Sequence, residues 1–321
     1  MVVKLLSRLR KHNVDVRVVD DELKLGIPQG GIDAALLNDV REHKAEIIAY
    51  VKATYTDKDF ALIPPAPRQS LYHLTSMQRQ FYFEYLLDRS STAYHVPTIL
   101  RIEGALDVEV LESSFRQLML RHESLRTQFE MVDTVPYQRI VEAPAFAVEY
   151  AEGNETTLAS QIASFTRPFV LEEAPLFRVG LIRLSSEEHL LLIDFHHIIT
   201  DAVSSEVLIE DFLLFYGGSR PAPLRLQYRD YAEWQQSAPF QEELSESRRY
   251  WQSRFSDKPA VLSLSTDYAR PSVRSQAGAS EYFCLDSKLH HGLEQLALSE
   301  QTTLFSVLLS IYTLVLSRWS G

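Results

Sequence analysis

The sequence predicts a mixed α/β (α+β) protein, in which a small α-β-β-α-α domain precedes a larger domain that combines a mixed sheet with flanking helices. Three observations support this fold class. Hydrophobic residues make up 45% of the 321 positions, which is enough for a sizeable core. Apolar residues follow helical spacing in some segments and strand alternation in others. A proline-rich stretch separates roughly the first fifty residues from the rest.

The first segment predicts a helix, a hairpin and two further helices. Residues 2–12 place apolar side chains at helical spacing. Residues 14–25 hold two runs that alternate between apolar and charged side chains around a pair of aspartates, which is typical of a short hairpin. Residues 32–52 return to helical spacing, with a break expected near Asp39. We therefore assign residues 1–54 to a small N-terminal domain.

The next stretch predicts a connector. Residues 55–70 carry three prolines in four positions, which favours an extended, semi-rigid linker. Residues 71–321 then form one larger domain, in which helical and strand-like patterns alternate. Its expected elements are a helix at 76–88, a strand at 98–103, a helix at 107–122, a strand at 125–129, a buried strand at 190–195 and a helix at 203–216.

Composition narrows the class of function. The formal net charge of −11 argues against nucleic acid as the main ligand, because phosphate neutralisation needs a basic face. The longest apolar stretch, residues 307–316, is interrupted by polar residues and falls short of the ~20 residues that a membrane-spanning helix needs. The single cysteine, Cys284, allows neither an internal disulfide nor a cysteine-based metal cluster. We therefore expect a soluble, cytoplasmic protein that binds neither membrane nor nucleic acid.

Two adjacent histidines follow the buried strand. His196 and His197 stand at its end, and Asp201 comes shortly after them. Neighbouring side chains on a strand face opposite ways, so one histidine at most can be catalytic. A neutral imidazole can accept a proton near pH 7, which suits an amine that attacks an acyl group. A metal site and a packed structural pair remain alternatives for these residues.

Four segments in order resemble one family. Residues 196–202 read His-His-Ile-Ile-Thr-Asp-Ala and are similar to the HHxxxDG signature of nonribosomal peptide synthetase condensation domains. Residues 76–82 resemble the S-x-A-Q-x-R-L-W motif of that family, with departures at Met77 and over the last three positions. Residues 121–127 match R-H-E-x-L-R-T, and residues 228–234 match Y-x-D-Y-x-x-W. The resemblance implies a chloramphenicol-acetyltransferase-like fold over most of residues 70–321.

The resemblance also assigns roles to residues. His197 would face the reaction centre, and His196 would support it. Asp201 would be structural and would pair with Arg126 or Arg121. The motif segments at residues 121–127 and 228–234 are otherwise expected to be architectural.

One residue in the signature departs from the family. Ala202 stands where the family has glycine, and glycine permits close backbone approach or a positive φ. We therefore expect the added methyl group to reduce activity.

The chemistry that the resemblance implies is amide formation without a covalent enzyme intermediate. A donor acyl or peptidyl thioester on the phosphopantetheine arm of one carrier protein would react with an aminoacyl amine on a second carrier protein. The domain itself would bind no cofactor and no metal. The family's active site lies between two lobes, here expected at about 71–255 and 256–321, and the second lobe is only begun. On this basis we expect a truncated enzyme that cannot turn over as it stands.

The first fifty or so residues resemble TubC-type N-terminal docking domains in their order of elements. That resemblance implies a partner, an upstream synthetase or polyketide synthase subunit whose C-terminal tail adds as a strand to the hairpin edge. Arg17 and Lys24 are the candidates for contacting an acidic tail, and a homodimer through this domain is a further expectation. Two alternatives for the whole chain are an interaction fragment without activity and an epimerisation domain, which shares the histidine pair.

Overall fold

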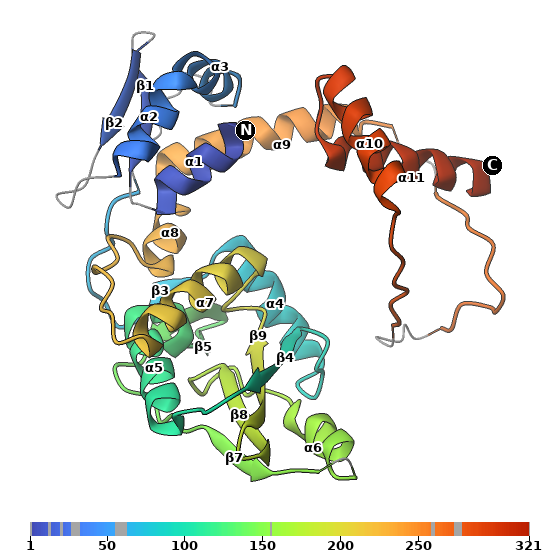
Figure 1. Cartoon of the computed structure of the whole chain (residues 1–321). Coiled ribbons are helices and arrows are strands. Elements are labelled where there is room, and N and C mark those ends of the chain that lie inside the picture. The colour runs from blue at the N-terminus through green and yellow to red at the C-terminus, as the bar shows by residue number, and fades with distance from the viewer. Residues whose placement is uncertain are drawn as a thin grey trace. The chain divides into compact units, whose positions relative to one another are not determined.

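The computed structural model describes residues 2–11, 14–19, 22–26, 33–54, 63–154, 156–257, 261–272 and 278–320. The chain divides into two compact units, Met1–Leu62 and Ile63–Gly321 (Figure 1). Of the residues expected to form the linker, 55–62 lie outside the described part of the chain. The mixed α/β class is confirmed, because each unit combines helices with a sheet.

The first unit has the predicted α-β-β-α-α order. Its elements are α1 (Val2–Lys11), β1 (Asp15–Val19), β2 (Glu22–Gly26), α2 (Ala34–Glu42) and α3 (Lys44–Thr54). The strands pair antiparallel, with Arg17 opposite Lys24. Side chains from all three helices build a separate small core, including Leu9, Leu36 and Ile47.

The break between α2 and α3 lies at His43 rather than near Asp39, where we had expected it. Asp39 lies inside α2, and its carboxylate accepts a hydrogen bond from Arg8 Nη1 at 2.6 Å. The helix continues past Asp39 because Leu36 and Val40 pack into the core, although aspartate has a low intrinsic helix propensity.

The second unit contains two sheets. The three-stranded sheet has the order β3 (Tyr72–His73), β6 (Val135–Ile140), β5 (Thr127–Val132). The four-stranded sheet has the order β4 (His95–Glu103), β9 (Glu188–His196), β8 (Phe177–Ser185), β7 (Glu149–Glu152). Strands β7 and β8 run parallel and the other pairs are antiparallel, so the larger sheet is mixed, as predicted.

Strand β9 lies inside the four-stranded sheet and is covered on both faces. Leu191 and Phe195 contact the main core, to which α4 (Ser76–Leu87), α5 (Val108–Arg121) and α7 (Ala202–Tyr216) also contribute. Leu190 and Leu192 face a second cluster that includes residues of α6 (Leu158–Phe165). Successive side chains on a strand alternate between its faces, so burial on both faces accounts for the continuous apolar run.

The remaining helices follow α7. They are α8 (Tyr228–Trp234), α9 (Ala238–Arg254), α10 (Ser287–Ser299) and α11 (Leu304–Ser320), and a short 3-10 turn, η1 (Glu123–Arg126), precedes β5. Among the described residues, no single helix is both long and apolar enough to cross a membrane. The pair α10 and α11 passes that test only when taken together, and it is bent by 104°.

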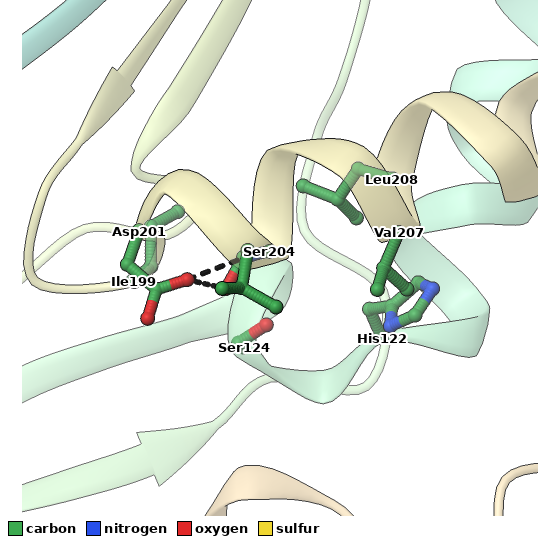
Figure 2. Close-up of a pocket in the computed structure, with 8 residues that line it drawn as sticks. His122, Ser124, Ile199, Asp201, Ser204, Val207 and Leu208 are labelled. Carbon is green, nitrogen blue, oxygen red and sulfur yellow. Dashed lines mark hydrogen bonds between the residues drawn. The ribbon is translucent and has the colours of Figure 1, made fainter. Parts of the chain in front are cut away.

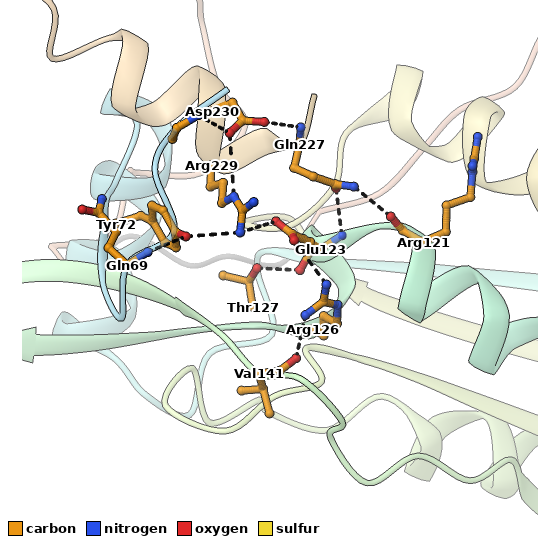
Figure 3. A network of polar contacts seen from close by, with 11 residues as sticks. Gln69, Tyr72, Arg121, Glu123, Arg126, Thr127, Val141, Gln227, Arg229 and Asp230 are labelled. Carbon is orange, nitrogen blue, oxygen red and sulfur yellow. Dashed lines mark hydrogen bonds and ion pairs between the residues drawn. The ribbon is translucent and has the colours of Figure 1, made fainter. Parts of the chain in front are cut away.

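A polar network joins the segments at 121–127 and 228–234 (Figure 3). Glu123 is its centre, with Arg126 Nη2 at 3.3 Å from one carboxylate oxygen and Arg229 Nη1 at 3.2 Å from the other. The Gln227 side chain accepts from the backbone N–H of Glu123 at 3.1 Å. The Asp230 carboxylate in turn accepts from the backbone N–H of Gln227 at 2.7 Å. Because these side chains are mostly buried and contact one another, the two segments hold η1 against α8.

Helix α7 begins at Asp201, directly after the histidine pair. The Asp201 carboxylate accepts hydrogen bonds from the backbone N–H of Ser204 at 2.7 Å and from its hydroxyl at 2.6 Å. These bonds, the hydroxyl's first, hold the pKa of the Asp201 carboxyl below its usual value. Ala202 is the first helical residue and does not have a positive φ. Its backbone conformation therefore does not require glycine at this position.

The expected pairing of Asp201 with an arginine is wrong. Arg126 is bonded to Glu123 and to the Val141 carbonyl, and Arg121 donates to Asp211. In the part of the chain that the structure describes, neither arginine forms an ion pair with Asp201. The physical reason is local, since a helix N-terminus offers unpaired N–H groups and a favourable dipole to a carboxylate that stands beside it.

This cap predicts a modest cost for removing the Asp201 side chain. Asp201→Ala should lower the free energy of unfolding of the second unit by about 0.5–2 kcal/mol, the usual cost of a lost N-cap. Asp201→Asn should be nearly neutral, because asparagine caps equally well. Urea denaturation of the chain measures both. A loss of roughly 3–5 kcal/mol for the alanine variant would instead indicate a broken buried ion pair.

Candidate active site

The histidine pair lies at the turn that ends β9. His196 is the last residue of the strand and pairs in register with His95 at the start of β4. The backbone N–H of His197 donates to the Tyr94 carbonyl at 2.8 Å, and that of Ile199 donates to the His196 carbonyl at 3.1 Å. The chain therefore turns sharply after His196, and the two imidazoles have different surroundings.

The His197 imidazole is half-buried and is held on two sides. Its Nδ1 lies 2.8 Å from the Thr200 carbonyl oxygen. A carbonyl can only accept, so Nδ1 carries the hydrogen, and the Nε2 of a neutral ring keeps its lone pair. The ring also stacks on Phe81 of α4, with 5.3 Å between the ring centroids and 23° between the planes. These contacts fix both the tautomer and the orientation of a base whose Nε2 can accept a proton.

The His196 imidazole is 5% exposed and has a different role. Its Nδ1 accepts a hydrogen bond from the backbone N–H of Ile198 at 3.1 Å, so this nitrogen carries no hydrogen. Burial lowers the pKa of His196 to about 3, and the neighbouring His95 and His197 contribute to that shift in the same direction. His196 is therefore neutral at physiological pH and closes the turn that carries His197.

The two arginines expected at the site, Arg121 and Arg126, have partners other than Asp201. Arg121 Nε and His122 Nε2 each lie 2.7 Å from the same oxygen of Asp211, on α7. Burial lowers the pKa of His122, although the Asp211 carboxylate acts in the opposite direction. Arg121 and Arg126 therefore connect elements of the fold, and neither contacts His196 or His197 in the described part of the chain.

An open pocket of about 250 Å³ lies beside the start of α7 (Figure 2). It is lined by His122, Ser124, Ile199, Asp201, Val203, Ser204, Val207 and Leu208. His197 does not line this pocket. The pocket lies on the side of the 198–201 loop where Asp201 caps α7. It is not the space beside the proposed base.

Several residues near the histidines were not identified from the sequence. Phe81 stacks on His197, and Tyr94 lies edge-on to Phe81 with 4.9 Å between centroids. Phe81 falls within the segment that resembles the first family motif, which was the available signal. His95, on the neighbouring strand, is the register partner of His196, and the buried Asp194 lies two residues before His196 on β9. For Asp194 and His95, the signal in the sequence was an acidic residue inside an apolar strand.

Groups of three or more metal-ligating side chains do not occur among the described residues. Beside His196, a histidine and a carboxylate meet in the bond between His95 Nδ1 and Asp194 Oδ2, at 2.8 Å. His197 does not take part in that bond, since its own Nδ1 is committed to Thr200.

The low pKa of His196 predicts a pH-dependent stability with a definite sign. Below pH 6.5 the unfolded chain binds a proton at this residue, and the folded chain does not bind it until about pH 3. Stability should therefore fall as the pH drops from 6.5 toward 3, by up to about 1.4 kcal/mol per pH unit from this residue. His196→Asn keeps an acceptor near the Nδ1 position and removes the titration.

Urea unfolding of the native chain and of His196→Asn between pH 4 and 6 tests this. The slope of the free energy of unfolding against pH should be smaller in the variant by about one proton. Equal slopes in the two proteins would show that His196 titrates alike in the folded and unfolded states.

Each of the two units matches a known protein family. The condensation domain family model matches residues 68–321. The model of the TubC N-terminal docking domain matches residues 2–52.

Curated relatives are large synthetases. Bacitracin synthase 2 of Bacillus licheniformis is 33% identical over 321 residues, which cover 100% of this chain and 12% of that protein. Surfactin synthase subunit 1 of Bacillus subtilis (strain 168) is 39% identical over 291 residues, which cover 91% of this chain and 8% of that protein. The chain thus spans only a small part of the length of these relatives.

Solved structures agree on the fold. The X-domain from teicoplanin biosynthesis superposes with a TM-score of 0.72 at 26% identity, over 81% of this chain and 60% of that one. The EpoB NRPS cyclization-docking bidomain from Sorangium cellulosum superposes with a TM-score of 0.68 at 23% identity, over 100% of this chain and 65% of that one. Because the condensation family model covers well over half of the 321 residues, the chain belongs to the condensation domain family, with a TubC-type docking domain at its N-terminal end.

Proposed function

We propose that the condensation domain joins a carrier-bound acyl or peptidyl donor to the amine of a carrier-bound aminoacyl acceptor, and that His197 is the catalytic residue. The observation that carries this proposal is the bond from His197 Nδ1 to the Thr200 carbonyl, which leaves Nε2 as the free nitrogen of a partly exposed ring. Membership in the family and the synthetases among the relatives support the substrate class. The domain would use no bound cofactor, since both substrates arrive as thioesters on phosphopantetheine arms.

In the proposed reaction, one proton passes from the attacking amine to the leaving thiolate through His197. The acceptor amine attacks the donor thioester carbonyl, so that a C–N bond forms and the C–S bond breaks. Nε2 takes the proton that the amine loses and returns it to the departing thiolate, or it stabilises the charged tetrahedral intermediate. While Nε2 holds the proton, the Nδ1–H bond to Thr200 stabilises the imidazolium. Two tethered reactants also replace a bimolecular encounter, which lowers the entropic part of the barrier.

Replacement of His197 tests the catalytic assignment. In the synthetase subunit that carries this chain, His197→Ala should slow amide formation between loaded donor and acceptor carriers by at least about 100-fold. Single-turnover assays with labelled donor measure the rate. The matched control is Ala202→Gly, which restores the family's residue beside the site and should keep at least the native rate. Unchanged product formation in the alanine variant would remove His197 from the mechanism.

The N-terminal unit is proposed to dock an upstream subunit by strand addition. The hairpin of β1 and β2 is a two-stranded sheet, and strands of such a sheet keep an edge that a peptide can extend. Lys24 in the middle of β2 is exposed and suits an acidic tail, and it lies opposite Arg17, whose side chain lies outside the described residues. The match to the docking family supports this role, and a second copy of the chain would compete for the same edge.

Charge reversal at Lys24 tests the docking surface. Lys24→Glu should weaken binding of an acidic peptide, taken from the C-terminal tail of the upstream subunit, by about fivefold at low salt and less at high salt. Calorimetric titration gives the Kd. Lys44→Glu, an exposed charge at the start of α3, is the control with equal change in net charge. Equal Kd values for the native and Lys24→Glu chains, at low salt, would rule out the β2 edge as the acidic-tail site.

A further inference from the structure

One face of β9 carries a buried carboxylate for which the proposed reaction has no direct use. Leu190, Leu192, Asp194 and His196 alternate along the strand and therefore share a face. The two leucines pack into the apolar cluster beneath α6. The Asp194 side chain is 0% exposed. A third leucine would continue the pattern and would avoid the cost of burying a carboxylate, so the acid must be explained by what it holds.

Two side chains from the neighbouring strands converge on Asp194. His95, from β4, places its Nδ1 2.8 Å from Oδ2, and Arg178, from β8, places Nη1 3.6 Å from the same oxygen. Arg178 is itself anchored, because it donates to the Phe165 carbonyl at 3.2 Å and lies 3.8 Å from the centroid of the Phe169 ring. The arginine thus balances the buried charge, and His95 takes up the hydrogen-bonding capacity of Oδ2.

The bond to Asp194 determines the state of His95. A carboxylate only accepts, so the hydrogen lies on Nδ1 of His95. Nε2 of His95 is buried and has no hydrogen-bond partner within the described residues. A hydrogen on Nε2 would be a buried donor without an acceptor, which is costly. Asp194 therefore selects one tautomer and one ring orientation for His95.

His95 and Phe169 in turn form the surface on which His196 lies. His95 pairs in register with His196, and their rings meet edge-on at 6.1 Å between centroids. Phe169 stacks on His95 at 4.9 Å and meets His196 edge-on at 6.2 Å. His196 uses its Nδ1 to hold the Ile198 N–H, and Ile198 directly follows His197. A continuous set of contacts thus leads from Asp194 to the turn that carries His197.

We propose that Asp194 and His95 are positioning residues for the condensation reaction, which act through His196 to hold the His197 imidazole in the tautomer and orientation that leave Nε2 free. This inference rests on the proposed function of His197. The Asp194 carboxylate supplies the acceptor, His95 supplies the ring, and Arg178 makes the buried charge tolerable.

Two substitutions separate the hydrogen bond from simple packing. His95→Phe keeps a ring that can stack on Phe169 but removes the Nδ1–H bond to Asp194. Asp194→Asn can keep an acceptor in the place of Oδ2, at a cost in stability, because its amide group replaces Oδ1, which has no partner among the described residues, and because Arg178 loses its counter-charge. If only packing mattered, the phenylalanine variant would behave as native. The hydrogen bond predicts instead that His95→Phe disturbs His197 and that Asp194→Asn largely preserves it.

The first measurement is the tautomer of each histidine. Two-bond ¹H–¹⁵N correlation spectra of the histidine-labelled chain report which ring nitrogen carries the hydrogen. The native chain and Asp194→Asn should show His197 with its hydrogen on Nδ1 and His196 with none on Nδ1. His95→Phe should show a mixture at His197. Glu188→Gln removes a partly exposed carboxylate at the other end of β9 and serves as the matched control. The signals of His196 and His197 should not change in this variant.

The second measurement is kinetic and uses the synthetase subunit that carries this chain. His95→Phe should lower kcat by about tenfold with the KM for the acceptor carrier unchanged, since a misoriented base affects the chemical step. Asp194→Asn should stay within about twofold of native. Native His197 and His196 signals in a folded His95→Phe protein would overturn the proposal, and so would an Asp194→Asn protein that matches His95→Phe. The spectra do not depend on turnover, so a native enzyme that forms no amide would refute the proposed function and leave the tautomer comparison decisive.

Discussion

The geometry of the site depends on one hydrogen bond, from the backbone N–H of Ile198 to Nδ1 of His196. This bond requires an imidazole nitrogen without a hydrogen, and burial of His196 keeps that nitrogen free by lowering its pKa to about 3. The bond closes the turn at the end of β9, so that the next side chain, His197, leaves the buried face and meets Phe81 and the Thr200 carbonyl. His196 is therefore structural, and its neighbour His197 is the residue that we propose to be catalytic.

The segments that resemble family motifs meet in three dimensions although they are far apart in the chain. Phe81, from the first, stacks on His197. Residues 121–127 and 228–234 share the network around Glu123, which joins η1 to α8. Buried ion pairs add little net stability, because desolvation of the charges offsets their attraction. The network therefore acts mainly by orienting the segments that it joins. Phe81 therefore helps to position His197, whereas the network around Glu123 orients η1 and α8.

The docking unit differs from the condensation domain in its core and in the way it is proposed to bind. Its core is small and separate, built from side chains such as Leu9, Leu36 and Ile47. In the docking proposal, backbone pairing at the hairpin edge would bind the partner and the charge of Lys24 would provide selectivity. A unit of this kind needs only a stable hairpin and an exposed edge, and these are features that strand alternation produces over a short stretch of sequence.

Features that follow from local patterns could be predicted from the sequence. Alternation and helical spacing predicted the α-β-β-α-α unit, the buried strand β9 and the helix after it, and they placed His196 and His197 at the strand end. The catalytic role of His197 stays a prediction. The resemblance had implied an arginine for Asp201, which instead caps α7 through the nearby Ser204. The partners of Asp194 could not be predicted from local patterns, because His95 and Arg178 lie on adjacent strands. The reason is physical, because periodicity reports which face a side chain takes, whereas its partner depends on the register of strands about a hundred residues apart in the chain.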